Sequence, residues 1–490
     1  MSKPSKLSKT KETKETKEKK AKNETVYLDL GNGLLEVKEY ETALLYFEKA
    51  VKQDPKSDQA LFGIACCQYE LNLGIEKVLH NITNALKLNP AAQYFDFAAM
   101  AFFISGNHEV ALRYQIQANN LSSTYQSLSN LSDMYKKLGH IKKAMDIAEY
   151  MVIASPYNLD SVLHCAALLL LQGEYEKGWA LWEYRRKRKF LCRTYKQPYW
   201  DGSDLTGKTI FLYCEQGFGD TIQFVRFVPL VKQNYENVKI IFEFTPPIKD
   251  LLSQISCADE TIMFADNSDN SILNKEFDYH CSILSLPHYL KNTLEYIPYP
   301  DGYLEADRVK EARWKSLLNT KLLKVGIVWH GSTTVDDRRN IPLREFIPLL
   351  NLENIQFYSL QLGEASKQIK GNGLEEKIID YTDEFIDFSD TAAFIKNLDL
   401  VIGVDTSVIH LSGALGKTTW LMSRMDGCWR WMSDREDSPW YSSVSIYRQN
   451  TWLDWSPVFD KIKLDLVGKE IRSRPSDHKD HKPQKPHHHY

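Results

Sequence analysis

Small and apolar residues recur along the first third of the chain at an interval of about 34 residues. A small residue stands at one phase of this repeat: Ala43, Ala111, Ala144 and Gly178. These positions lie 68, 33 and 34 residues apart, so the first interval covers two periods. A residue that ends a helix recurs in the same register, with serine in the third unit: Pro55, Pro90, Ser123 and Pro156. The period predicts antiparallel helix pairs that stack into an α-solenoid over residues 24–190, and five units exceed the about three that such a core needs.

The most regular unit covers residues 24–56. Its large and small positions are Tyr27, Leu30, Gly31, Leu34, Tyr40, Ala43, Phe47, Ala50 and Pro55. They resemble the tetratricopeptide repeat (TPR), in which small residues let two helices pack closely and large ones fill the groove. The second unit carries about one extra residue near residues 73–74. The resemblance implies a concave surface that binds a protein partner or acceptor.

Beyond residue 190 the repeat stops, and short β-branched and aromatic runs alternate with helical patterns, as in an α/β sheet. Strands are expected at residues 209–213, 238–244, 324–329, 355–360 and 398–403. Helices are expected at residues 220–233, 344–350 and 391–398. Pro229 falls inside the first of these helices and is expected to kink or end it. A segment rich in Tyr and Pro, residues 292–303, predicts a linker between two α/β domains, residues 198–300 and 304–466.

Composition narrows the class of protein. A net charge of −3 favours neither nucleic acid nor a membrane surface as partner. The sequence contains no run of 18 apolar residues, so it predicts no transmembrane segment. The eight Cys form no CxxC pair or regular framework. The ends, residues 1–23 and 468–490, are rich in Lys and in His, Lys and Pro, and we expect them to be disordered. These features favour a cytoplasmic protein.

Two segments in the second half carry candidate chemistry. The first is a glycine turn between a strand and a helix: Glu215, Gln216, Gly217, Phe218, Gly219, Asp220 and Thr221. The second, residues 403–414, also follows a strand and opens a helix. Free N–H groups at a helix start suit a phosphate. Two such domains facing one cleft are the layout of a glycosyltransferase that uses a nucleotide sugar.

Residues 198–466 resemble the heptosyltransferase-type glycosyltransferases, and more closely the bacterial proteins in which TPR units precede such a domain. The resemblance rests on residues 215–220, 325–329, 337–343, 405–416, 429–431 and 438–441. It implies a GT-B pair of Rossmann-like domains behind the solenoid. It also implies transfer of a sugar to a hydroxyl of a protein or glycan acceptor, with inversion at the anomeric carbon.

The glycine turn supplies the candidate base. Gly217 and Gly219 are expected to allow positive φ or close approach of the backbone to a ligand. In the related enzymes an Asp after this turn is proposed to take the proton of the acceptor hydroxyl, which points to Asp220. A helix N-cap is the alternative role for Asp220, and a donor contact is another. Glu215, at the end of the strand, is the nearest competitor.

The second segment supplies the candidate donor site. The resemblance places Thr406 and Ser407 at the donor pyrophosphate, while Asp405 is expected to cap the helix or contact ribose or sugar. His410 lies one turn further on the same face and is expected to contact the donor phosphate or sugar. Gly413 is expected to keep the helix slim against the sheet.

A loop after the strand at residues 324–329 offers positive charge. Trp329 begins this loop, and Arg338 and Arg339 close it. A guanidinium stabilises a leaving nucleoside diphosphate without a metal. A surface ion pair with Asp336 or Asp337 is the alternative role for these arginines. No DxD triplet follows a strand, so we expect transfer without a metal or other cofactor.

Two other functions remain open at this point. A TPR scaffold could carry a transferase-like domain that has lost its activity, and donor binding by residues 198–466 would distinguish it. An epimerase on the same fold would act on the donor without an acceptor.

Overall fold

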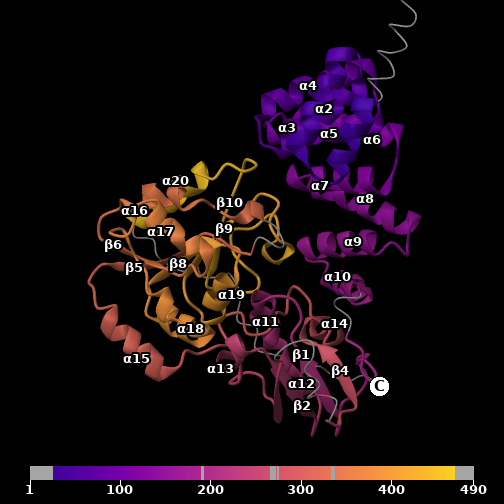
Figure 1. The fold of residues 1–490 in the computed structure, drawn as a ribbon. Coiled ribbons are helices and arrows are strands. Elements are labelled where there is room, and N and C mark those ends of the chain that lie inside the picture. The colour runs from indigo at the N-terminus through magenta and orange to yellow at the C-terminus, as the bar shows by residue number, and fades with distance from the viewer. Residues whose placement is uncertain (1–25, 189–192, 265–271, 273–274, 333–336, 469–490) are drawn as a thin grey trace, which may run out of the picture. The chain divides into compact units, whose positions relative to one another are not determined.

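The computed structural model describes residues 26–188, 193–264, 272, 275–332 and 337–468. The chain forms two compact units, residues 1–156 and 157–490 (Figure 1). The first is helical, and the second holds two parallel sheets behind one helix pair. The two disordered tails predicted at residues 1–23 and 468–490 lie outside the described residues, except for Gly468.

The first unit is a stack of antiparallel helix pairs. A helix over residues 26–36 precedes the others, which are α2 (Tyr40–Gln53), α3 (Asp58–Glu70), α4 (Ile75–Leu88), α5 (Ala92–Ile104), α6 (His108–Leu121), α7 (Tyr125–Lys137) and α8 (Ile141–Ala154). The solenoid predicted from the repeat is therefore confirmed. The second helix of each pair begins 33 to 35 residues after its predecessor, and the interval of 35 contains the predicted extra residue near 73–74.

The register of small and terminating residues explains the packing. The fourth residue of each second helix is buried, and these residues are Ala43, Val78, Ala111, Ala144 and Gly178. The predicted terminators each stand two residues beyond a helix end: Pro55, Pro90, Ser123 and Pro156. Phe47 shows why some positions must be small. A Cβ on Gly31 would lie 2.7 Å from its ring, and one on Gly63 would lie 2.5 Å from it.

The second unit begins with a fifth helix pair, α9 (Leu159–Leu171) and α10 (Tyr175–Trp182), followed by the 3-10 helix η1 (Glu183–Lys187). Trp179 of α10 is buried edge-on against Trp429 and Trp440 of the sheet region, with ring centroids 5.3 and 6.4 Å apart. A Cβ on Gly173, between the two helices, would lie 2.6 Å from Leu294. The last repeat therefore shares its core with the α/β part of the chain.

The first sheet is parallel, with strand order β3-β2-β1-β4. Its strands are β1 (Thr209–Tyr213), β2 (Lys239–Phe244), β3 (Glu260–Met263) and β4 (Tyr279–Ser282). Between them run α11 (Phe218–Phe224), η2 (Val225–Phe227), α12 (Val228–Asn234), η3 (Pro246–Ile248) and α13 (Lys249–Leu252). After β4 come η5 (Ile283–Ser285) and α14 (Leu286–Tyr289). The chain builds outward from β1 on one side and returns to its other side with β4. A switch point of strand order therefore lies at β1.

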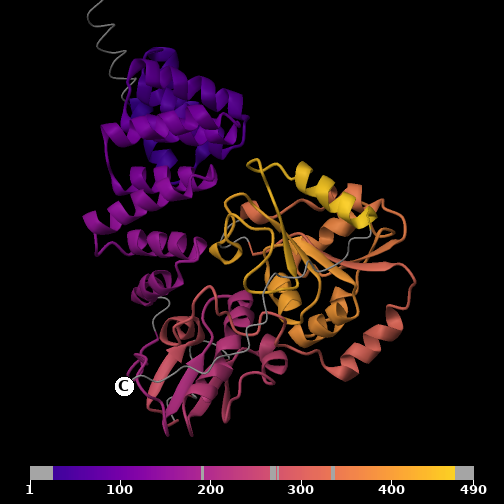
Figure 2. The same ribbon diagram turned by 180° about the vertical axis from the view of Figure 1, so that it is seen from behind.

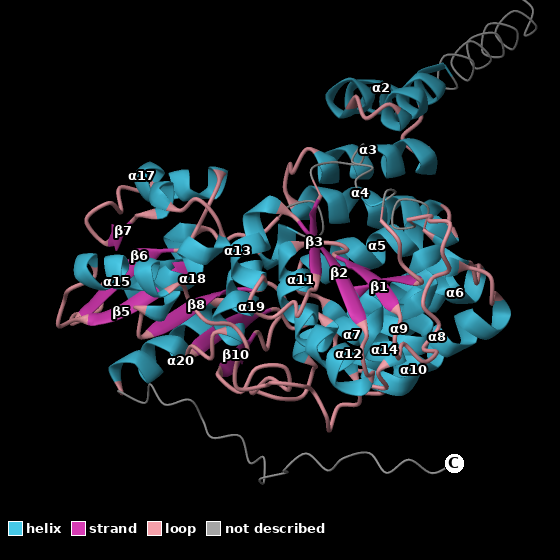
Figure 3. Ribbon diagram, turned by 90° about the horizontal axis from the view of Figure 1, so that it is seen from below, coloured by secondary structure: helices cyan, strands magenta, loops and turns pink. Residues whose placement is uncertain are grey.

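The second sheet is also parallel, with order β10-β9-β8-β5-β6-β7 (Figure 3). Its strands are β5 (Leu323–Val328), β6 (Ile355–Ser359), β7 (Ile378–Ile379), β8 (Leu400–Val404), β9 (Thr419–Ser423) and β10 (Val444–Arg448). Its helices are α15 (Arg308–Leu317), η6 (Asp337–Arg339), η7 (Leu343–Phe346), α16 (Ile347–Leu350), η8 (Glu364–Lys367), α17 (Gln368–Gly371), η9 (Thr382–Glu384), α18 (Phe388–Lys396), α19 (Ser407–Ala414), η10 (Trp429–Trp431) and α20 (Ser456–Val467). The order reverses between β5 and β8, which is the switch point of this sheet.

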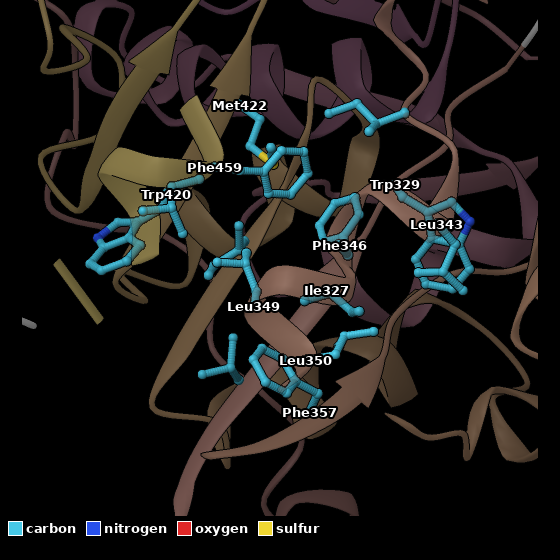
Figure 4. Packing of buried hydrophobic residues seen from close by; sticks show 14 of the residues in the cluster. Ile327, Trp329, Leu343, Phe346, Leu349, Leu350, Phe357, Trp420, Met422 and Phe459 are labelled. Carbon is cyan, nitrogen blue, oxygen red and sulfur yellow. The ribbon is translucent and has the colours of Figure 1, made fainter. Parts of the chain in front are cut away.

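An apolar cluster fills one side of the second sheet (Figure 4). Ile327 of β5, Phe357 of β6 and Trp420 of β9 meet Phe346 and Phe459 there. Phe346 and Phe459 pack edge to face, with their ring centroids 5.0 Å apart. This core holds β5 and β8 side by side, and so fixes the loops that follow them.

The predicted helix over residues 220–233 is broken as expected. The α-helical turns of α11 end at Phe224, η2 follows, and Pro229 stands in the first turn of α12. Strand β1 matches its predicted bounds, while β3, β4, β7, β9 and β10 are additional to the predicted strands. Among the described residues, no helix is long and apolar enough to span a membrane.

The glycines of the first helix allow a matched test of the solenoid packing. Gly31→Ala places a methyl group against Phe47, whereas Gly33→Ala meets nothing within 4 Å. Both changes gain the same helix propensity, but only the first overpacks the core. We expect Gly31→Ala to lower the free energy of unfolding by about 2 kcal/mol relative to Gly33→Ala, measured by urea unfolding and circular dichroism. Equal stability of the two variants would contradict this packing.

Candidate active site

Both candidate segments stand at switch points of strand order. Ligands of open parallel sheets bind outside the carboxyl ends of the strands at such points. The glycine turn follows β1, and the segment beginning at Asp405 follows β8. The loop that carries Arg339 follows β5, the neighbour of β8. The topology therefore places three of the predicted segments at the carboxyl ends of strands, next to the switch points of the two sheets.

The two segments also touch each other, because α11 packs against α19 (Figures 1 and 2). A Cβ on Gly219 would lie 3.0 Å from Cδ2 of His410 and 3.4 Å from Cα of Ser407. The close approach expected of this glycine is therefore made to the second segment of the protein. The positive φ of the turn, 65°, falls on Gln216, so the interpretation that Gly217 or Gly219 supplies it is wrong.

Asp220 stands in the first turn of α11, with Gly217 as the N-cap residue. Its Oδ2 accepts a hydrogen bond of 3.1 Å from the Gly217 backbone N–H. Asp220 therefore closes the helix start from the third helical position and is not itself the N-cap. Its other oxygen, Oδ1, accepts a hydrogen bond from Nη2 of Arg430.

Arg430 lies in η10 and connects the regions of the two sheets. Its Nε donates to Oε1 of Gln223 in α11 at 2.6 Å, and its Nη1 contacts Sγ of Cys428 at 3.0 Å. The guanidinium carbon stands 4.4 Å from the centre of the Trp429 ring. The sequence analysis did not identify Arg430. The available signal was a charged residue between two tryptophans, Trp429 and Trp431, in a segment that already carried the family resemblance.

His410 is buried and neutral. Its Nδ1 lies 3.0 Å from the Tyr441 hydroxyl, its ring stacks on Trp431 at 5.2 Å, and its Nε2 is 3.8 Å from Oδ1 of Asp405. Burial, together with the positive charge of Arg430, holds the pKa of His410 well below its ordinary value. A neutral imidazole at this place serves as a hydrogen-bond partner and not as a cation.

Asp405 lies in the same electrostatic neighbourhood. Burial raises the pKa of Asp405, and the nearby guanidinium groups of Arg430 and Arg339 oppose this by lowering it. The negative charge of Asp220 also acts to raise it. Two carboxylates and two guanidinium groups from separate segments thus influence one another.

The start of α19 has unused hydrogen-bonding capacity. Thr406 is the N-cap residue, yet its side chain makes no capping hydrogen bond. Its Oγ1 is buried and has no hydrogen-bond partner among the described residues. The first N–H groups of a helix lack partners within the helix, so this end presents donors. Gly413, at the other end, faces Tyr441, whose Cγ would lie 2.5 Å from an added Cβ.

The two arginines of the β5 loop differ. Arg339 donates from Nη2 to the Ser332 carbonyl at 3.2 Å, and its Nε is buried without a hydrogen-bond partner among the described residues. Arg338 is exposed, with its guanidinium carbon 5.6 Å from the centre of the Trp452 ring. Arg339 is therefore the one that belongs to the neighbourhood of Asp405. The alternative ion pair with Asp336 or Asp337 involves side chains outside the described residues.

Two predicted site residues lie elsewhere. The side chain of Trp329 is fully buried in the apolar cluster beside Leu343, so a donor contact by this indole is wrong (Figure 4). Glu215 forms a two-bond ion pair with Arg185 of η1, at 3.0 and 3.1 Å. Both of its oxygens are engaged, which favours a structural role over its predicted role as a base.

The junction between the sheets contains a second buried guanidinium, Arg226. It donates to the carbonyls of Trp440 at 2.7 Å and Pro298 at 3.3 Å, and to the Tyr303 hydroxyl at 3.0 Å. The Tyr303 hydroxyl in turn donates to the Ile222 carbonyl at 2.6 Å. The predicted linker segment is thus hydrogen-bonded to α11 and η2, and Arg226 also bonds the region of the second sheet at Trp440.

Among the described residues, no group of three or more His, Cys, Asp and Glu side chains forms a metal site. Asp387, one of the few clustered acids, is the N-cap of α18 and accepts from the Ser389 backbone N–H at 2.8 Å. Transfer without a metal stays a prediction.

No known protein-family profile matches the chain. The protein FlbA of Caulobacter vibrioides is 25% identical over 472 residues, which cover 89% of this chain and 77% of that protein. Among solved structures, PilF of Pseudomonas aeruginosa is 18% identical with a TM-score of 0.31, covering 34% of this chain and 77% of its own. A thermophilic TPR protein of Thermus thermophilus is 22% identical with a TM-score of 0.29, covering 34% of this chain and 91% of its own.

Gly219 can be tested against Gly217 within the same turn. A Cβ on Gly219 presses on His410, which cannot move because Trp431 and Tyr441 hold its ring, whereas a Cβ on Gly217 meets only Asp220 Oδ2 at 3.5 Å. We expect Gly219→Ala to destabilise the second unit by about 1 to 3 kcal/mol. Gly217→Ala should cost less, and denaturant titration with tryptophan fluorescence measures both. A Gly219→Ala protein as stable as the Gly217→Ala protein would refute the contact.

The buried His410 predicts a pH dependence of stability. The folded state keeps this imidazole neutral, while the unfolded chain takes up a proton below about pH 6.5. Stability is therefore present above that pH and is lost as the pH falls, by up to about 1.4 kcal/mol per pH unit. His280, whose pKa burial lowers to about 4, adds a similar slope. The free energy of unfolding, measured in urea, should fall less steeply between pH 6.5 and 5 in His410→Gln than in the wild-type protein. The difference should correspond to one proton, because His280 remains in both proteins. An unchanged slope would contradict a neutral His410.

Proposed function

We propose that the protein is a glycosyltransferase that moves a sugar from a nucleotide sugar to a hydroxyl group of a protein or glycan acceptor. The observation that carries the proposal is the contact of the two switch-point segments at Gly219. This contact brings a carboxylate from one parallel sheet, Asp220, to the donor-type helix start of the other. Two parallel-sheet domains that meet in this way correspond to the GT-B arrangement.

In the proposed reaction, Asp220 accepts the proton of the acceptor hydroxyl. The hydroxyl oxygen forms a bond to the anomeric carbon, and the bond between that carbon and the phosphate oxygen breaks. The electron pair leaves with the nucleoside diphosphate, and attack in line with the leaving group inverts the anomeric centre. A general base typically contributes 10²–10⁴-fold to the rate.

The donor diphosphate is proposed to lie at the start of α19. The Thr406 hydroxyl and the first N–H groups of the helix supply hydrogen bonds, and Arg339 supplies positive charge with its unpartnered Nε. We favour Arg339 over Arg338 for this role because Arg339 lies close enough to affect the pKa of Asp405. Neutral His410 would hydrogen-bond the donor without repelling the cations around it.

The first unit is proposed to bind a protein, either the acceptor or a partner that recruits it. Stacked helix pairs present an extended concave surface, and solenoids of this kind use it for binding.

A second candidate is a TPR scaffold whose α/β region is inactive. One observation favours it: both oxygens of Asp220 are already hydrogen-bonded, to Gly217 and to Arg430. A carboxylate held in this way has both oxygens engaged and neither free to accept the proton of a hydroxyl. Nucleotide binding without turnover in the presence of suitable acceptors would support this function.

The experiment that tests the proposal is thermal unfolding of the full chain with a panel of nucleoside diphosphates and nucleotide sugars, with EDTA present. A ligand at 100 times its Kd stabilises the folded protein by about 2.7 kcal/mol. A shift with one nucleotide would support the donor site and identify the donor class. No shift with any member of the panel would contradict the proposed transferase.

Replacement of the candidate base gives a sharper prediction. Asp220→Asn removes the proton acceptor but keeps the side-chain volume, so we expect release of nucleoside diphosphate to fall by about 10²-fold or more while donor binding persists. Asp437→Asn is the matched control, because Asp437 pairs with Arg435 on the surface of the same unit. Unchanged turnover in Asp220→Asn would remove Asp220 from the role of base.

A further inference from the structure

We propose that Arg430 binds the donor diphosphate, and that Asp220 occupies this guanidinium until the donor arrives. The ion pair then keeps the base inactive in the empty enzyme, and the donor releases it. The inference rests on the proposed function and adds to it a phosphate-binding residue and an order of events.

The position of Arg430 is the first support. Its side chain is 13% exposed, contacts Asp220 and Gln223 of α11, and lies close enough to act on Asp405, which precedes α19. Among the described residues, Asp220 is the one carboxylate within ion-pair distance of it. Its other acceptors are the amide oxygen of Gln223 and Sγ of Cys428, neither of which is a carboxylate. A buried cation with one partly exposed carboxylate partner is poised to exchange that partner for a stronger anion.

Unused donors beside this pair are the second support. The side-chain oxygen of Gln223 accepts a hydrogen bond from Arg430. The amide nitrogen Nε2 of Gln223 is fully buried and has no hydrogen-bond partner among the described residues. The hydroxyl oxygen of Thr406, at the start of α19, is also buried without a hydrogen-bond partner among the described residues. Buried donors without acceptors are costly. An anion with several oxygens would satisfy them together with Arg430.

The exchange has a consequence for the base. When diphosphate oxygens accept the Arg430 hydrogen bonds, Asp220 loses its partner cation, and its Oδ1 becomes free to accept the proton of the acceptor hydroxyl. Its link to the Gly217 backbone N–H keeps it at the helix start. The acceptor hydroxyl is then deprotonated only after the donor is in place, which protects the enzyme from a misplaced acceptor.

The test is calorimetric titration of the full chain with the nucleoside diphosphate that stabilises it most among ADP, GDP, UDP and CDP. Arg430→Gln should bind this probe at least about tenfold more weakly, since a hydrogen bond to a charged group is lost. Arg430→Lys should recover part of the affinity. Asp220→Asn should bind it about two- to fivefold more tightly, because the internal competitor is gone. The double variant Asp220→Asn/Arg430→Gln should bind as weakly as Arg430→Gln.

The surface pair Arg435 and Asp437 supplies matched controls. Arg435→Gln and Asp437→Asn change the same charges and should leave the affinity within about twofold. Unchanged or weaker binding by Asp220→Asn overturns the inference, even if Arg430→Gln fails to fold, and leaves the proposed function standing. Unchanged binding by folded Arg430→Gln also overturns it. A wild-type protein that binds none of the four diphosphates overturns both the inference and the proposed function.

Discussion

The burial of Arg226 at the junction of the two sheets is the constraint on which the candidate site depends. Its guanidinium gives hydrogen bonds to the Trp440 and Pro298 carbonyls and the Tyr303 hydroxyl, and it has no ion-pair carboxylate among the described residues. Such a group keeps its charge only where its donors are satisfied. Any shift of one sheet against the other would break these bonds in a dry environment. Because α11 and α19 follow strands of different sheets, their contact at Gly219 depends on this junction.

The charged residues of the candidate site come from four separate segments of the chain. Asp220 and Asp405 come from two sheets, and Arg430 and Arg339 come from two further loops, so strand topology brings together groups that are far apart in sequence. The acids and the guanidinium groups balance in the described structure. The diphosphate proposed above would change that balance. Asp220, whose side chain is 20% exposed, is the carboxylate that would then lose its partner.

Much of this arrangement could be read from the sequence. The solenoid followed from a period that needs no tertiary information, since small residues such as Ala43 and terminators such as Pro55 recur in one register through most of the pairs. Strand β1 and the break before Pro229 followed from local pattern and from the geometry of proline. Strands such as β4, with the polar sequence Tyr279 to Ser282, were missed because their burial comes from neighbouring strands and not from their own composition.

The candidate site divides in the same way. Gly219, Asp220, Asp405 and His410, which lie close together in the structure, could be selected from the sequence because each stands in a local motif. Trp329 was misplaced because a tryptophan after a strand fits a ligand site and a core equally well, and only packing decides. Arg430, Arg226 and Arg185 were not recognised, because their partners lie far away in the chain.

The packing of the last helix pair against the sheet region determines where a chimeric protein should be joined. Trp179 and Arg185 belong to the repeat by sequence but to the α/β unit by their contacts. A chimera that exchanges recognition modules should therefore be joined between Pro156 and Tyr157, where the compact units divide. A junction near residue 190 would separate Glu215 from its arginine and expose tryptophan faces, although the repeat ends there. The module that can be exchanged is thus one helix pair shorter than the repeat array.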